Sequence, residues 1–437
     1  MKNQVQNNIL EHTGVATWDE IIQKSDNLQI PSIFQVSKNT PSYNALKDNA
    51  LSAIEDYIKE PRDSVGATIF IDGKVISNPI RFLTDHPKNT SESLEVWKNR
   101  ILPNKSLVVK IDTVSTLSDE LHYSLHDFLY PLFESNAIPL GGVAVSFEFG
   151  DHQWSPYGLE EDLTPKKKLT INTGKTKQVL YQWTPEKKKE LGGLIMKNAK
   201  MQNFKEYVTD YSEKDELAEN QMAIMLSQGI HITQHTGFYE KIQIRIGDLT
   251  RKELLEEMLF NIAAAAMSVE VRGKEASILP VYNANKHDEF TQEMLKDLKY
   301  SGNDLNISMR DLLRKSFKEI CYARRSNQGF VGAIQSKEIK EVSAAFRNVS
   351  DNTKIKLKNT NFKIEYYSIN NQTYLFMRGQ KVAVKQSESV TDLIDTLNQG
   401  GVITWGTLGE SNNWQLPALH KLIQLAYKFR VLEITNP

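Results

Sequence analysis

The chain has 437 residues, 40% of them hydrophobic and 24% charged, so it has an ordinary globular composition and enough length for two or three domains. Its 53 basic and 54 acidic side chains nearly cancel, which excludes a global electrostatic field that would attract nucleic acid or an anionic membrane. The single cysteine, Cys321, excludes an intramolecular disulfide and a multi-cysteine metal site, so any metal must be held by His, Asp or Glu. There is no stretch approaching the roughly 20 apolar residues of a membrane span and no apolar signal segment, so we expect a cytoplasmic protein without membrane contact.

The first part of the chain alternates helical and strand-like patterns. Residues 45–60 place apolar side chains on one face and predict a helix. Two strand-like runs within 66–77 flank Asp72-Gly73, a pair that tolerates the positive φ of a tight turn, and they predict a β-hairpin. Residues 106–114 predict a further strand.

A second helix is predicted at 115–135, where apolar residues recur at helical spacing after possible Ser and Thr caps. His122 and His126 lie four residues apart on it, a spacing that can hold a metal. Because no third ligand lies nearby, we interpret the two histidines as part of a partly exposed helix face.

From residue 139 the pattern turns to short strands, at 139–150, 167–174, 177–183 and 229–247. In the last of these, three isoleucines alternate with Gln243 and Arg245. The polar stretch 186–226 is interpreted as helical. Most of these strands lack a crossover helix between them, which favours an antiparallel barrel or sandwich over a doubly wound sheet.

The last two fifths of the chain are first helical and then mixed. Residues 250–325 predict helices that pack on the next domain or on a second copy of the chain, or that only form a core. From residue 335, three short strands with turns at Asn370-Asn371 and Gly379 precede two helices and a closing strand. This order is typical of a winged-helix-like module, but it contains no basic recognition helix, so we do not expect nucleic-acid binding.

Two stretches carry a resemblance to a known family: 149–183, FGDHQWSPYGLEEDLTPKKKLTINTGKTKQVLYQW, and 226–247, LSQGIHITQHTGFYEKIQIRIG. Together they resemble the metal half-sites of the JmjC and cupin-like iron(II)/2-oxoglutarate oxygenases. In that family a His-x-Asp/Glu loop leads into a strand near Gly-x-Lys and an aromatic residue, and a second His follows a later Gly turn. The resemblance covers about 66–250.

The resemblance implies an α+β fold, a double-stranded β-helix (cupin/JmjC) barrel, with the architecture of the ribosomal-oxygenase branch. Residues 1–250 would form the barrel with its N-terminal helices. Residues 251–334 would be a helical linker or dimerisation region, so a homodimer is one expected assembly. Residues 335–437 would form the winged-helix-like domain.

The same resemblance implies a metal site whose ligands depart from the family pattern. Glu160 stands where the first His is expected, and Asp162 supplies the carboxylate. The distal ligand is either His231 or His235, while an ungapped register places Ile232 at that position and leaves no distal His. A carboxylate-rich set of this kind can hold iron or manganese.

Without the resemblance, residues 160–162 are interpreted as a solvated acidic turn facing the lysines at 166–168. His152 is a further candidate ligand, although a histidine in such a loop more often satisfies a hydrogen bond. GKTK at 174–177 lacks the preceding glycine and following helix of a phosphate loop.

For 2-oxoglutarate, the family uses a basic side chain on a barrel strand. The resemblance places Lys177 or Lys175 there, and Lys241 or Arg245 on the last strand could substitute. Arginine can bind a carboxylate through two parallel hydrogen bonds, and lysine supplies a point charge with three donors.

The sequence therefore predicts an iron(II)/2-oxoglutarate-dependent oxygenase that hydroxylates a protein or peptide. The alternative is a catalytically inactive cupin-fold protein that serves as a binding subunit or scaffold. A third hypothesis is a metal-dependent cupin of another reaction class, such as an isomerase or hydrolase.

Overall fold

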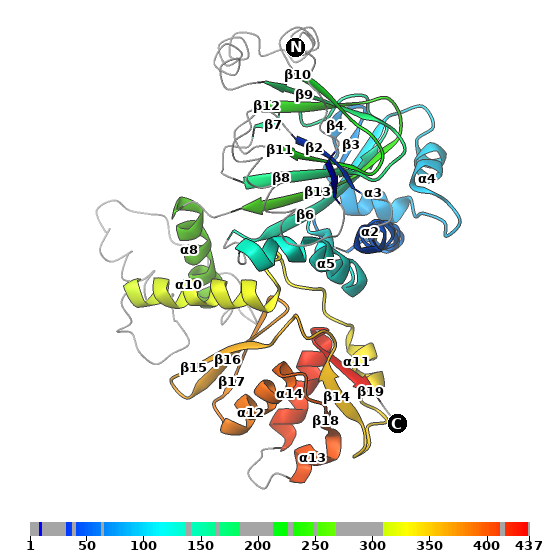
Figure 1. Ribbon diagram of the computed structural model, residues 1–437. Coiled ribbons are helices and arrows are strands. Elements are labelled where there is room, and N and C mark those ends of the chain that lie inside the picture. Colours follow the sequence, from blue (N-terminus) through cyan, green and yellow to red (C-terminus); the bar gives the residue numbers. More distant parts are fainter. Residues whose placement is uncertain are drawn as a thin grey trace, which may run out of the picture. The chain divides into compact units, whose positions relative to one another are not determined.

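The structure is a computed structural model (Figure 1). It describes residues 8–10, 32–36, 41–62, 65–136, 141–158, 160–161, 166–183, 213–225, 230–247, 251–267, 309–410 and 416–435. These form two compact units, one of Met1–Asp248 with Arg324–Pro437 and one of Leu249–Ala323. Among the described helices, none is long and apolar enough to cross a membrane.

In the described part of the first unit, eight successive strands pair antiparallel within two sheets. In chain order they are β6 (Val143–Gly150), β7 (Glu160–Glu161), β8 (Lys166–Asn172), β9 (Gln178–Trp183), β10 (Glu213–Leu217), β11 (Gln221–Met225), β12 (Ile230–His235) and β13 (Tyr239–Gly247). A nine-stranded sheet, called here the large sheet, contains the order β11-β8-β13-β6, and a four-stranded sheet, the small sheet, has the order β10-β9-β12-β7. Each of these neighbouring pairs is antiparallel.

The order of these strands identifies the type of fold. Counted from β6, the first, third, sixth and eighth strands lie in the large sheet, and the other four lie in the small sheet. This alternation is the strand order of the double-sheet jelly rolls that include the cupins. The mixed α and β composition and the cupin-like antiparallel sheets expected from the sequence are therefore confirmed, whereas closure into a barrel stays a prediction.

The large sheet continues beyond the eight strands on both sides. The additional strands are β5 (Leu107–Ile111), β3 (Ala67–Ile71) and β4 (Lys74–Val75) next to β6, and β2 (Ser32–Val36) and β1 (Asn8–Leu10) next to β11. Asp72 and Gly73 connect β3 to β4 with φ angles of 50° and 74°, which confirms the predicted hairpin turn.

Helices cover one face of the large sheet. They include α2 (Pro41–Lys59) and α5 (Asp119–Asn136), and the first unit also contains α3 (Pro79–Asp85), α4 (Leu94–Ile101) and the short 3-10 helix η1 (Val114–Thr116). At the start of α5 the Ser118 hydroxyl accepts a hydrogen bond from the Leu121 backbone N–H at 3.1 Å, the expected cap.

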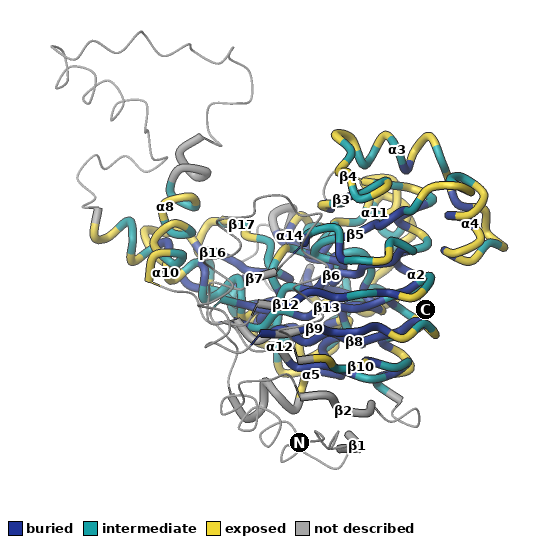
Figure 2. Tube along the Cα trace, turned by 90° about the horizontal axis from the view of Figure 1, so that it is seen from above, coloured by how far each residue is buried: buried dark blue, intermediate teal, exposed yellow. Residues whose placement is uncertain are grey.

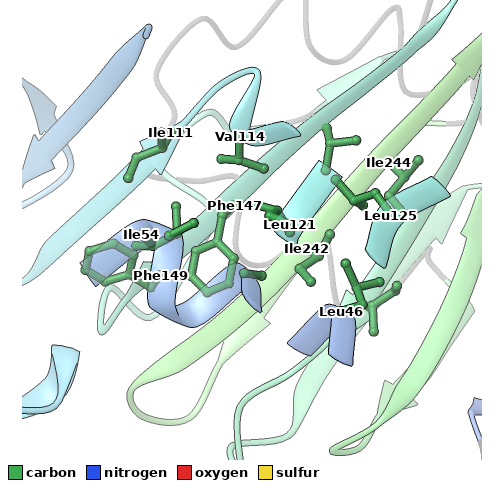
Figure 3. Close-up of a cluster of buried hydrophobic side chains, with 14 of the residues drawn as sticks. Leu46, Ile54, Ile111, Val114, Leu121, Leu125, Phe147, Phe149, Ile242 and Ile244 are labelled. Carbon is green, nitrogen blue, oxygen red and sulfur yellow. The ribbon is translucent and has the colours of Figure 1, made fainter. Parts of the chain in front are cut away.

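The main hydrophobic core lies between these helices and the large sheet (Figure 3). Leu46 and Ile54 of α2 and Leu121 and Leu125 of α5 belong to one buried cluster with alternate residues of the strands. On the strands the labelled members are Ile111, Phe147, Phe149, Ile242 and Ile244. Each such side chain contributes roughly 1.5–3 kcal/mol when fully buried, so this face contributes strongly to the stability of the unit.

The helical interpretation of 186–226 is wrong for its described C-terminal part. Residues 213–217 and 221–225 are strands β10 and β11, paired with β9 and β8 respectively. Among the described strands, β10 has a neighbour on one side only, and its Lys214 and Glu216 are exposed. A polar edge strand has the composition of a solvated helix surface, and only its pairing distinguishes the two.

The C-terminal part of the first unit contains two three-stranded sheets and four helices. In chain order its elements are α11 (Ile339–Ala345), β14 (Lys354–Leu357), β15 (Glu365–Ile369), β16 (Gln372–Met377), β17 (Gln380–Lys385), α12 (Glu388–Asn398), β18 (Ile403–Thr404), α13 (Trp405–Glu410), α14 (Leu416–Lys428) and β19 (Leu432–Thr435). The predicted turns of the β15-β16-β17 meander are confirmed, because Asn370, Asn371 and Gly379 all have positive φ.

The sequence alone suggests that His122 and His126 lie on a partly exposed helix face, but the structure buries both. They are 0% and 1% exposed. The ring of Phe362, from the segment before β15, packs on both of them at centroid distances of 5.0 and 5.2 Å. A helix face that looks solvated in its own sequence is covered here by a segment more than 200 residues later in the chain.

The second unit contains α8 (Arg251–Met267) and most of α10 (Met309–Ser326). The Ser316 hydroxyl donates a hydrogen bond to the Met258 carbonyl at 3.0 Å and joins the two helices. Leu259 and Phe260 on α8 are 45% and 70% exposed. Dimerisation through this region stays a prediction.

Candidate functional site

The large sheet is polar on the face opposite its hydrophobic core. Successive strand residues point to opposite faces, so the neighbours of the core residues face the small sheet. On β6, β8 and β13 these neighbours are Ser146, Glu148, Lys168, Thr170, Asn172, Lys241, Gln243 and Arg245. All except the partly exposed Arg245 are buried, and both sheets are buried along most of their described length (Figure 2).

The small sheet presents polar side chains to the same space. His231, Thr233 and His235 alternate along β12 and are all buried. Hydrogen bonds join the two sheets here: Lys168 Nζ lies 3.3 Å from His231 Nε2, and the Gln178 amide donates to Asn172 Oδ1 at 3.0 Å. Buried polar groups require hydrogen-bonding partners or ligands, so this inter-sheet space is the candidate site.

Strand register divides the inter-sheet space into layers. One layer, called here the Lys168 layer, contains Lys168, Arg245 and His231; Arg245 is the cross-strand partner of Lys168. The other, the Glu148 layer, contains Glu148, Lys241, Asn172, Tyr239 and His235, with Lys241 paired to both Glu148 and Asn172. Thr170 and Gln243 are paired between the two layers.

The Lys168 layer combines two cations with an imidazole. Lys168 is 1% exposed and His231 is 4% exposed. Lys168 Nζ and His231 Nε2 lie within hydrogen-bonding distance of each other, at 3.3 Å. Arg245 Nε is buried and has no hydrogen-bond partner among the described residues.

The Glu148 layer is a buried ion pair with two aromatic neighbours. Glu148 Oε1 lies 2.8 Å from Lys241 Nζ and accepts a hydrogen bond from the Tyr239 hydroxyl at 2.9 Å. Burial, reinforced by Glu148, holds the pKa of Tyr239 well above its usual value. The His235 ring stacks on Tyr239, and burial, with Lys241 nearby, holds the pKa of His235 well below 6.5, so His235 is neutral.

Several polar atoms of these layers have no hydrogen-bond partner among the described residues. They are Arg245 Nε, Thr170 Oγ1, Glu148 Oε2 and both ring nitrogens of His235. A buried donor or acceptor that lacks a partner costs roughly 1–3 kcal/mol. Their concentration between the two sheets points to a polar ligand or ordered water in this space.

The residues implied as metal ligands are partly brought together. Backbone register pairs Glu160 of β7 with His231 of β12. Asp162 lies outside the described residues. His235 belongs to the other layer, and Ile232 lies in an apolar cluster with Tyr181 and Trp183 on the opposite face of the small sheet.

The implied 2-oxoglutarate anchors fall in different places. Lys177 has a side chain 65% exposed and lies 3.4 Å from Glu216 Oε2. Lys175 is also exposed. Lys241 is held by Glu148, whereas Arg245 lies in the Lys168 layer. His152 makes the loop hydrogen bond expected of it, with Nδ1 2.6 Å from the Trp154 carbonyl.

The described side chains alone do not assemble an iron centre, and the side chains of Glu160 and Asp162 lie outside them. Within the described part of the chain, no group of three His, Cys, Asp or Glu residues could hold a metal ion. A metal bonded to imidazole nitrogen lies about 2.0–2.1 Å from it. At His231 Nε2 that position is next to the buried Lys168 ammonium, which would repel a divalent cation.

The residues of the inter-sheet space that are absent from the sequence-based prediction of the site include Lys168, Glu148 and Tyr239. A signal was present, because Lys168, Thr170 and Asn172 alternate with Leu169 and Ile171. Such alternation ordinarily indicates a face exposed to water. Only the second sheet turns that polar face into an interior.

Comparisons with known proteins add little to this description. No protein-family model matches the sequence, and no curated protein is significantly similar. Among solved structures, the ribosomal oxygenase YcfD from Escherichia coli, in complex with cobalt and 2-oxoglutarate, is 12% identical with a TM-score of 0.43, over 96% of this chain and 98% of that chain. The same protein with cobalt and succinic acid is 11% identical with a TM-score of 0.41, over the same shares.

A third solved structure, the coconut allergen cocosin, is 7% identical with a TM-score of 0.17 over 24% of this chain and 22% of that chain. Scores at these levels carry no inference about activity. The fold follows from the strand order of the chain itself.

Proposed function

We propose that this chain is a cupin-fold protein that binds a small carboxylate between its two sheets, with 2-oxoglutarate as the first candidate. The observation that carries the proposal is the buried Nε of Arg245, which has no hydrogen-bond partner among the described residues. A buried donor that lacks an acceptor costs roughly 1–3 kcal/mol. An anion beside Arg245 would supply that acceptor.

The chemistry of the Lys168 layer favours a carboxylate over other anions. A guanidinium matches the planar carboxylate with two parallel hydrogen bonds, and a neighbouring ammonium adds a point charge. A second polar group of the ligand would meet Thr170 Oγ1, one step further along the strand and without a hydrogen-bond partner among the described residues.

Same-face residues on one strand are about 6.6 Å apart, at about 3.3 Å per residue. This spacing suits a short dicarboxylate such as 2-oxoglutarate, whose two carboxylates are separated by three carbon atoms. A closed barrel around the ligand, as the sequence predicts, would exclude water from these contacts.

An iron(II)/2-oxoglutarate-dependent oxygenase is the second candidate function. One observation favours it: the register places Glu160 opposite His231, which with Asp162 is the ligand set that the family resemblance implies. In both candidates we propose a protein or peptide as the partner, with residues 335–437 as a winged-helix-like docking module. β17 has one strand neighbour in the described part of the chain, so its other edge is open to an added peptide strand.

Calorimetric titration of the full-length protein with 2-oxoglutarate, after treatment with EDTA, tests the first candidate. We expect one binding site per chain and an affinity at least about tenfold lower for Arg245→Gln, because the variant loses the charged, two-pronged contact. Arg81→Gln, at an exposed arginine of α3, is the matched control and should bind as the unmodified protein does. Absence of binding, or equal loss in both variants, contradicts the proposal.

The second candidate is tested by supplying iron(II) under anaerobic conditions, adding oxygen, and measuring succinate formed from 2-oxoglutarate. Iron-dependent succinate formation that disappears in His231→Gln would establish the oxygenase and displace the first candidate. Carboxylate binding without any turnover would favour the binding protein.

A further inference from the structure

The Glu148 layer contains buried polar atoms that the proposed carboxylate site does not use. Glu148 Oε2 and both ring nitrogens of His235 are buried and have no hydrogen-bond partner among the described residues. Gln178 Oε1 is a further atom of this kind. Gln178 is the cross-strand partner of His235 and donates to Asn172 of the Glu148 layer, so these atoms gather at one level between the two sheets.

This level is separate from the level of Arg245. Lys241 of the Glu148 layer and Arg245 are four residues apart on β13, a separation of about 13 Å at about 3.3 Å per residue. Thr170 and Gln243 are paired between them. A short dicarboxylate bound at Arg245 is therefore too small to contact the Glu148 layer as well.

We propose that the Glu148 layer is a second binding subsite, which takes a primary carboxamide. The ligand class is a molecule that carries an uncharged CONH2 group, as the side chains of asparagine and glutamine do. The inference goes beyond the proposed carboxylate binding and does not depend on it.

The hydrogen-bonding groups of the layer suit a carboxamide. Glu148 Oε2 and Gln178 Oε1 are acceptors, so together they can accept from the two N–H groups of the amide nitrogen. The Lys241 ammonium has three donors, and among the described residues only Glu148 Oε1 accepts one of them, so a donor remains for the amide oxygen. The neutral His235 ring adds one donor and one acceptor in either tautomer.

The charge of the layer favours an uncharged group. Glu148 and Lys241 lie 2.8 Å apart with side chains 1% exposed, so their charges cancel within the layer. A carboxylate would lie beside Glu148 and an ammonium beside Lys241, and repulsion between buried like charges is stronger than in water. A ketone would leave both Glu148 Oε2 and Gln178 Oε1 without a donor, and a hydroxyl has one donor for the two. A carboxamide avoids these costs.

Titration of the full-length protein with propanamide, followed by saturation-transfer NMR of the ligand, tests the inference. Butanone and propanoate have nearly the same shape as propanamide but lack its N–H donors, and propanoate adds a negative charge. We expect propanamide to bind at least about tenfold more tightly than either, with propanoate measured in Arg245→Gln to remove the proposed carboxylate contact. Equal binding of butanone, or no binding of propanamide, would overturn the inference and leave ordered water as the occupant of the layer.

Substitutions locate the propanamide site. His235→Phe keeps a ring against Tyr239 and removes both ring nitrogens, so we expect at least about tenfold weaker propanamide binding without a loss of stability in urea denaturation. Gln178→Met is a second variant of similar length, which removes the Oε1 acceptor and should weaken propanamide binding in the same way. His86→Phe, at the partly exposed C-cap of α3, is the matched control and should bind propanamide as the unmodified protein does.

The two proposed sites are distinguished by measuring both ligands. Arg245→Gln should weaken 2-oxoglutarate binding but retain propanamide binding, and His235→Phe should do the reverse. Loss of propanamide binding in Arg245→Gln, or its retention in both His235→Phe and Gln178→Met, would overturn the inference. If 2-oxoglutarate binds to none of these proteins, the proposed function fails, and the propanamide measurements still decide whether the Glu148 layer binds an amide.

Discussion

The two faces of the large sheet are both buried, yet their chemistry is opposite. One face carries Phe147, Phe149, Ile242 and Ile244 against α2 and α5. The other carries Glu148, Lys168 and Lys241 against the small sheet. Apolar burial on the first face stabilises the fold. The second face contains the Glu148–Lys241 ion pair and polar atoms that have no hydrogen-bond partner among the described residues, an arrangement that stabilises little unless a ligand is bound. The contrast separates the part of the sheet that holds the fold from the part that can bind.

The largest expected effect is on the apolar face. Phe147→Ala removes a ring that is 1% exposed and should lower the free energy of unfolding by about 3–5 kcal/mol, since it leaves a cavity in the core. Urea denaturation measures the change. Val75→Ala, at a side chain 65% exposed, should change stability by less than about 0.5 kcal/mol. Equal effects of the two variants would contradict the assignment of the core.

On the polar face, Glu148→Gln should also be strongly destabilising, by about 3 kcal/mol, because Lys241 would remain as a buried charge without its carboxylate. The double variant Glu148→Gln with Lys241→Met removes both charges and should recover most of this loss. A recovery of stability in the double variant would show that the loss in Glu148→Gln comes from the unpaired charge of Lys241 and not from lost packing. No recovery would show that the ion pair itself stabilises the fold.

Acid should weaken the fold through the buried neutral histidines. The pKa of folded His235 lies well below 6.5, the value in the unfolded chain, so its contribution to stability is complete above about pH 6.5 and is lost as the pH falls toward the folded pKa. Over that range one histidine makes the free energy of unfolding fall by about 1.4 kcal/mol for each pH unit of acidification. Urea denaturation between pH 7 and pH 5 measures this pH dependence of the free energy of unfolding, which should be weaker by this amount in His235→Gln. An unchanged pH dependence in the variant would contradict the burial of a neutral ring.

The smallest effect is expected outside both faces. Lys177→Gln changes a side chain 65% exposed whose ion pair with Glu216 is at the surface, so stability should change by less than about 0.5 kcal/mol. The sequence points to Lys177 as the carboxylate anchor. The affinity of the Lys177→Gln variant for 2-oxoglutarate is therefore a more informative measurement than its stability. An unchanged affinity would support Arg245 as the anchor of the carboxylate, and a tenfold loss of affinity would support Lys177 as the anchor instead.

Local sequence patterns predicted much of the secondary structure. The hairpin at Asp72-Gly73 and the meander turns at Asn370-Asn371 were predictable because positive φ requires particular residues at those positions. The two strands within 213–225 were missed, because a polar edge strand and a solvated helix share the same composition. Pairing with β8 and β9 decided their structure.

The candidate site was predictable only in part for a related reason. Arg245, His231 and Lys241 were identified from the family resemblance, but the division into two layers depends on register between strands that are far apart in sequence. Lys168 was missed because its neighbours in the sequence are further lysines, which suggest a surface. Its contact with His231 joins residues 63 positions apart.

The sequence by itself determined the alternation of each strand, since side chains one residue apart must point to opposite faces. It therefore determined that Lys168, Thr170 and Asn172 share a face and that Leu169 and Ile171 share the other. Only the tertiary structure decided that both faces are buried. The helices cover one face and the small sheet covers the other, and long-range packing of this kind leaves no mark in the period of a single strand.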